Sequence, residues 1–235
     1  MRMMLSTISN HIASYLGKNL ESDQVKIEIY AYGLEILLGA AIKLLIILAL
    51  AWTLNALNTT LILLVTYAAL RWFGGGAHMS TYLKCLLLGT TLIVGMGSLS
   101  QFNLGTHLLA NLSMLTLAFA VFVCFRWAPG DTEKKPISAR EIRLRQKGKM
   151  AVMIAVWGFA NLYMLRYSFN TYALAMNLGC ISSVFFITPW GYKALALLDK
   201  LSKRGGVYDE SETAEVCYEC SGRSSGIHRW NRSQS

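Results

Sequence analysis

Charged residues are scarce in this sequence. Only 15% of its 235 residues are charged and 54% are hydrophobic, with a mean hydropathy of +0.41. A soluble domain of this length carries roughly a quarter charged residues, so the shortage excludes an ordinary soluble domain. The composition instead predicts an all-α, polytopic integral membrane helical bundle.

Features of several other protein classes are also missing. The 22 Lys and Arg residues outnumber the 13 Asp and Glu residues, but no basic face with interleaved aromatic residues accompanies them, so no nucleic-acid partner is expected. The five cysteines are odd in number and scattered, which argues against a disulfide framework. Cys217 and Cys220 form one CxxC pair without a second, too few ligands for a stable zinc site. No metal and no cofactor are expected.

The two ends of the chain differ from its middle. Residues 3–20 place apolar side chains at helical spacing, which predicts an amphipathic helix that lies in the membrane interface or packs on the rest of the protein. The first 22 residues lack the unbroken apolar core of a cleavable signal peptide, so the N-terminus is expected to be retained. We therefore expect an interfacial helix at 1–22, a membrane-embedded domain at 23–204, and a disordered tail at 205–235.

Six apolar segments fill the middle of the chain, and each is compared with the ~20 residues that cross a hydrocarbon core. They lie at about 30–54, 57–73, 82–100, 104–127, 150–167 and 171–192. About six spans are therefore expected. The second and third segments are short or rich in glycine, so either is compatible with a re-entrant segment.

Basic residues are concentrated at 128–149 and after the last apolar segment. Since short cytoplasmic loops collect Lys and Arg, both termini and the 128–149 connection are expected in the cytoplasm, and alternation places residues 71–85 there as well. Two prolines and a glycine are expected to prevent a continuous helix across 128–149. Lys134 and Lys135 in this connection belong either to a solvated, lipid-facing charge cluster or to a docking surface for an acidic or amphipathic peptide.

The segment Arg71–Cys85 contains three consecutive glycines, His78, Cys85 and the cations Arg71 and Lys84. A thiol needs a base and an electropositive neighbourhood to become a nucleophile at neutral pH. On one helix His78 and Cys85 would be about 10.5 Å apart, too far for proton transfer. The glycines allow the backbone to bend and bring the two together. His78 is thus a candidate base and Cys85 a candidate nucleophile; a glycine-rich turn with an incidental His and Cys is the alternative.

The expected position of Cys85 has two further consequences. A cysteine in the first turn of a helix is favoured by the positive end of the helix dipole. Glycine N–H groups near that turn are candidates for binding a developing oxyanion.

Two charged residues lie inside the first apolar segment. Glu35 and Lys43 are costly in hydrocarbon unless they face other helices or water, so each is a candidate for a substrate-binding role. Their eight-residue spacing corresponds to about 12 Å along a helix, too far for a direct pair. A structural role, with each bonded to a neighbouring helix, explains them equally well.

The order Arg-x4-Gly-x-His-x6-Cys, read as Arg71, Gly76, His78 and Cys85, resembles the accessory gene regulator B family of bacterial quorum-sensing peptide-processing proteases. The similarity extends to the Tyr-Gly-Leu-Glu-Ile-Leu-Leu stretch at 32–38 and to the Ala-Pro…Lys-Lys-Pro-Ile stretch that begins at residue 128. It covers roughly residues 25–195. The tail after about 204 has no counterpart in the family's pattern.

This resemblance implies a multi-pass cysteine endopeptidase in a bacterial plasma membrane, with its active site on the cytoplasmic side. Family members cut the C-terminal part from a small amphipathic propeptide and leave a cyclic thiolactone or lactone autoinducing peptide; they work as membrane-embedded homodimers in lipid. The resemblance makes His78 and Cys85 the catalytic dyad. Arg71 and Gly76 become essential neighbours. The competing interpretation is a non-enzymatic transporter or sensor component.

Overall fold

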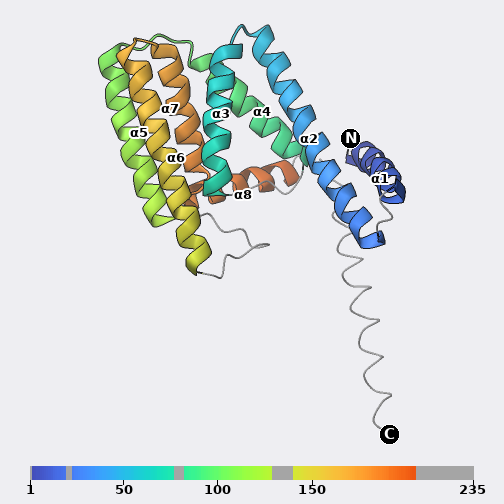
Figure 1. Ribbon diagram of the computed structural model, residues 1–235. Helices are drawn as coiled ribbons and strands as arrows, with labels where there is room; N and C mark the ends of the chain where they lie inside the picture. The colour runs from blue at the N-terminus through green and yellow to red at the C-terminus, as the bar shows by residue number, and fades with distance from the viewer. Residues whose placement is uncertain (1, 20–22, 77–81, 129–139, 205–235) are drawn as a thin grey trace. The chain divides into compact units, whose positions relative to one another are not determined.

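In the computed structural model, residues 2–19, 23–76, 82–128 and 140–204 are described. These residues form eight α-helices, which confirms the all-α expectation (Figure 1). Their bounds are α1 Arg2–Asn19, α2 Gln24–Thr53, α3 Leu57–Gly74, α4 Tyr82–Leu99, α5 Thr106–Arg126, α6 Arg140–Arg166, α7 Asn170–Phe185 and α8 Pro189–Arg204. His78, Lys134 and Lys135 lie outside the described residues, as does the tail after residue 204.

The observed helices follow the apolar segments of the sequence closely except at the α7–α8 pair and at α6. This helix begins at Arg140, so residues 140–149 of the expected connection are helical. Both prolines of that connection, Pro129 and Pro136, precede this start. Since proline disrupts a helix only where it occurs, the basic run after Pro136 is free to form the first turns of α6.

Four described helices are long and apolar enough to cross a membrane: α2, α4, α5 and α6. The number rises to five if the bent pair α7 and α8 counts as one span. The expectation of about six spans is therefore too high for the described part of the chain. Helix α3 is not among the candidates, because polar residues such as Asn58, Thr59 and Arg71 interrupt its 18 residues.

The segment expected as one span at 171–192 is broken into α7 and α8, which meet at an angle of 81°. The break has a local cause at Pro189, whose ring and missing N–H prevent α7 from continuing. Pro189 instead begins α8, a favoured first position in a helix. The hydroxyl of Thr188 accepts a 3.2 Å hydrogen bond from the Gly191 N–H and so caps the start of α8.

Met1–Ala196 form one compact unit, and within it α7 is the most enclosed helix. It packs against α3, α5 and α6 (Figure 1). Small side chains permit close helix approach in membranes, and several of the buried positions of α7 are small: Ala173, Ala175, Gly179, Cys180, Ser182 and Ser183. Cys180 and the α5 residue Cys124 both belong to the hydrophobic core between these helices, where a free cysteine packs as a small apolar side chain.

Helices α2, α3 and α4 form the second side of the unit and carry the residues of the candidate site. Helix α4 packs between α2 and α3 (Figure 1). On α3, Thr59 donates a 2.8 Å hydrogen bond to the backbone oxygen of Gly97 on α4. On α4, Tyr82 donates a bond of the same length to the backbone oxygen of Gly39 on α2. Interhelical bonds of this kind fix the register of neighbouring helices in lipid.

Candidate active site

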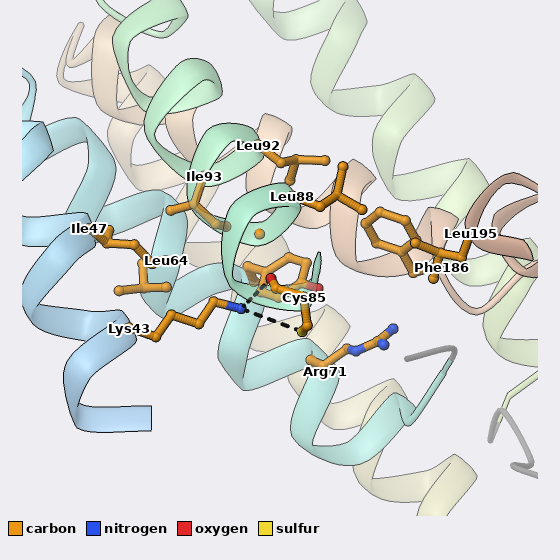
Figure 2. A pocket seen from close by; sticks show the side chains of 12 residues that line it. Lys43, Ile47, Leu64, Arg71, Cys85, Leu88, Leu92, Ile93, Phe186 and Leu195 are labelled. Carbon is orange, nitrogen blue, oxygen red and sulfur yellow. Dashed lines mark hydrogen bonds between the residues drawn. The ribbon is translucent and has the colours of Figure 1, made fainter. Parts of the chain in front are cut away.

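A cavity of about 190 Å³ lies among α2, α3, α4, the α7–α8 break and α8 (Figure 2). Most of its lining is apolar, but it also contains the Cys85 thiol from α4, the cations Lys43 from α2 and Arg71 from α3, and the Tyr67 phenol from α3. The apolar lining consists mainly of Ile47, Leu64, Leu88, Leu92, Ile93, Phe186 and Leu195. The structure therefore places a thiol and two cations in one largely apolar cavity.

Cys85 lies in the first described turn of α4, which begins at Tyr82. This agrees with the expectation of a cysteine near a helix N-terminus, where the helix dipole favours an anion. The side chain is half-buried and not in a disulfide. It is thus available for chemistry within the cavity.

Lys43 reaches across from the middle of α2 to Cys85, as the dashed lines in Figure 2 show. Its Nζ lies 3.9 Å from the Cys85 Sγ and donates a 3.4 Å hydrogen bond to the Cys85 backbone oxygen. In the sequence, Lys43 stands out as a charge in an apolar segment, whereas Arg71 and Lys84 are the cations expected near Cys85. Of those two, Arg71 is among the cavity residues and Lys84 is not.

Arg71 lies in the last turn of α3, on the cavity wall opposite to Lys43's helix. Its guanidinium carbon is 5.9 Å from the centre of the Phe186 ring, within the range of a cation–π contact. Tyr67, one turn earlier on α3, also lines the cavity. Neither Tyr67 nor Phe186 could be predicted from the sequence as a cavity residue, because neither lies in the motif that contains Arg71 and Cys85.

The glycines after Arg71 have distinct structural roles. The N–H of Gly75 donates a 3.0 Å bond to the Arg71 backbone oxygen and ends α3, so this N–H is already used and does not bind an oxyanion. Gly76 has a φ of +120°, a conformation that favours glycine. A side chain on Gly76 would overlap the Arg71 guanidinium and lie 2.8 Å from the Phe186 backbone oxygen. Gly76 thus makes room for Arg71 beside the cavity.

The remaining residues singled out from the sequence are not part of the described cavity lining. Glu35 lies on α2, two turns before Lys43, and is not among the residues that line the cavity. His78, Lys134 and Lys135 fall outside the described residues. Their expected roles stay predictions.

Comparison with known proteins gives a consistent result over most of the chain. Residues 9–187 match the family model described as AgrB, accessory gene regulator B. No solved structure matches the chain.

Three relatives show how far the sequence of this chain has diverged from those of similar proteins. The chain is 27% identical to AgrB-like protein 2 of Clostridium perfringens over 84% of its length and 94% of that protein. It is 27% identical to the accessory gene regulator protein B of Staphylococcus aureus over 78% of its length and 94% of that protein. It is 30% identical to an AgrB-like protein of Listeria innocua over 70% of its length and 78% of that protein. With a family match that spans well over half of its residues, this chain belongs to the accessory gene regulator B family.

Proposed function

We propose that this protein is a membrane-embedded cysteine endopeptidase that processes the precursor of an autoinducing peptide in bacterial quorum sensing. The observation that carries the proposal is the half-buried Cys85 thiol in a largely apolar cavity that also contains Lys43 and Arg71. Family membership supports the substrate class, because AgrB-like proteins process such precursors.

The first chemical step in this proposal is attack by Cys85 on a backbone carbonyl of the propeptide. His78 takes the thiol proton and the sulfur bonds to the carbonyl carbon. The carbon–nitrogen bond then breaks, and the departing nitrogen receives the proton from His78. The products are a thioester on Cys85 and a released C-terminal fragment with a new amino group.

The second step transfers the acyl group from Cys85 to a thiol or hydroxyl within the peptide. That group attacks the thioester carbonyl, loses its proton and displaces the Cys85 sulfur, which regains a proton. With a peptide thiol, one thioester replaces another at little energetic cost, and closeness of the two groups makes ring closure intramolecular. The first step converts an amide into a thioester and is uphill, so turnover depends on removal of the released fragment.

Arg71 is proposed to act on the peptide itself. Its guanidinium can hold a peptide carboxylate through two hydrogen bonds or polarise the reacting carbonyl. Lys134 and Lys135 are proposed to contact the propeptide. We further propose that the site and both termini face the cytoplasm, because basic residues are concentrated at 140–149 and 193–204.

The proposal is tested with purified protein in liposomes and a synthetic propeptide. We expect wild-type protein to release the C-terminal fragment and to show a peptide thioester on Cys85 by mass spectrometry. Cys85→Ala and His78→Ala should abolish release while membrane insertion is unchanged. Fragment release by the Cys85→Ala protein would refute the proposal, and substrate flux that survives Cys85 alkylation would favour a transporter.

A further inference from the structure

We propose that Lys43 is a catalytic residue whose ammonium group stabilises the Cys85 sulfur when that sulfur is an anion. This inference rests on the proposed function, in which Cys85 is the nucleophile. The sulfur carries negative charge before it attacks the peptide and again when it leaves the thioester. A positive group held against it favours both steps.

The first observation is the position of the Lys43 side chain. Its Nζ lies 3.9 Å from the Cys85 Sγ and 3.4 Å from the Cys85 backbone oxygen, although the two residues are 42 positions apart in the chain. An ammonium group has three N–H donors, so it can serve both acceptors at once. The bond to the backbone oxygen holds the ammonium in place, and the contact with Sγ keeps the positive charge beside the sulfur that reacts.

The second observation is that a glycine on α4 leaves room for the Lys43 ammonium. The backbone of Gly89, one turn after Cys85, lies directly beside Lys43. A Cβ atom at residue 89 would be 2.5 Å from Nζ and 3.0 Å from the preceding carbon of the lysine. Gly89 therefore acts as a positioning residue, because any larger side chain would displace the charge from the sulfur.

The third observation is the hydrogen bond that holds the two helices in register here. Tyr82 on α4 donates a 2.8 Å bond to the backbone oxygen of Gly39 on α2. Gly39 precedes Lys43 by four residues, and Tyr82 precedes Cys85 by three, so each pair lies on one face of its helix. The bond thus aligns the face of α2 that carries Lys43 with the face of α4 that carries Cys85.

The surroundings increase the effect of this charge. Ile47, Leu64, Leu92 and Ile93 line the same cavity, and an apolar wall reduces the screening of a charge by water. A lysine within a membrane helix is costly in free energy unless it has a partner. Cys85 provides that partner for Lys43. Arg71 and Tyr67 also face the cavity from α3, and the experiment therefore has to isolate the contribution of Lys43.

Two alkylating reagents of similar size separate the effect of charge beside Cys85 from the effect of access to its sulfur. Iodoacetate is an anion and iodoacetamide is neutral, so a cation beside the sulfur raises the rate of the first relative to the second. Both rates are measured on Cys85 of the full-length protein by peptide mass spectrometry, which separates this cysteine from the other four. The ratio of the two rates reports the local charge and cancels general changes in access.

We expect Lys43→Met to lower this ratio about 5- to 10-fold and to slow propeptide processing about 10- to 100-fold. These values lie within the range that Coulomb's law gives for a unit charge at about 4 Å, between the dielectric of water and that of a protein surface. Lys43→Arg keeps the charge and should keep the ratio within about twofold of wild type. Lys26→Met, which removes an exposed lysine from the same helix, is the matched control and should change neither quantity.

Gly89→Ala provides an independent test, because it leaves the lysine in the chain and displaces only its ammonium. We expect a lower ratio for this variant and an unchanged ratio for Gly95→Ala, whose added methyl meets no atom within 4 Å. If Lys43→Met does not fold, Gly89→Ala decides alone. A wild-type ratio in the folded variants, Gly89→Ala included, would overturn the role of Lys43. Processing by a Cys85→Ala protein would instead overturn the proposed function, and the alkylation ratio distinguishes the two failures.

Discussion

The clearest single-residue test of the site is Gly76→Ala. Gly76 has a φ of +120°, outside the conformations that alanine adopts readily. Such backbone strain costs about 1–3 kcal/mol. The new methyl group would also overlap the Arg71 guanidinium and lie 2.8 Å from the Phe186 backbone oxygen. The guanidinium is the end of a flexible side chain and can move, whereas the Phe186 oxygen belongs to the backbone, so Arg71 should be the group that leaves its place.

Displacing Arg71 removes the hydrogen bonds that its guanidinium is proposed to make with the peptide, and bonds to a charged group contribute about 1.5–3 kcal/mol. A loss of about 1.5–3 kcal/mol corresponds to a rate that is roughly 10- to 150-fold lower. The assay is fragment release from a synthetic propeptide by protein in liposomes, with the thermal unfolding midpoint measured for each variant. A reduced rate is expected whether or not the unfolding midpoint falls.

Gly95→Ala is the matched control for this experiment. Gly95 lies within α4, and its added methyl would meet no atom within 4 Å. Replacing a helical glycine by alanine stabilises a helix by roughly 0.5–1 kcal/mol, so this variant should process the propeptide normally. A Gly76→Ala protein that processes the propeptide within twofold of wild type, whatever its unfolding midpoint, would refute the role of Gly76 in placing Arg71.

Two further predictions concern the helix packing and the topology. Gly97→Ala places a methyl 2.9 Å from the Cα of Thr60, at the contact between α3 and α4. Overpacking of this kind should lower the free energy of unfolding, measured by denaturation in detergent, by about 1–3 kcal/mol. Gly95→Ala should not lower it. An equal effect of the two variants would contradict the close α3–α4 contact. In a variant that retains Cys85 as its only cysteine, a membrane-impermeant thiol reagent should label inside-out vesicles and not intact cells; labelling of intact cells would exclude a cytoplasmic site.

Much of the helical architecture follows from composition and local pattern. Long apolar runs with few charges must form helices in a bilayer, because each backbone N–H and C=O then bonds within its own segment. The positions of α2, α4 and α5 follow directly from such runs. The mean hydropathy of a segment is a poorer guide to a membrane span where polar residues make contacts between helices. Thr59 lowers the apolar character of α3 and donates to α4. Helix α3 is not among the candidate spans, so the described residues give four or five spans and not about six.

The sequence by itself also determined the residues of the central motif, since Arg71, Gly76 and Cys85 are close together in the chain and their chemistry is recognisable from residue type and spacing. Only the tertiary structure decided which cation contacts the sulfur. Lys43 is 42 positions from Cys85, and Phe186 reaches the cavity from a break about one hundred residues further along the chain. The physical reason is that periodicity shows which face of a helix is apolar, whereas the helix that lies opposite is chosen by packing and hydrogen bonding among all of them.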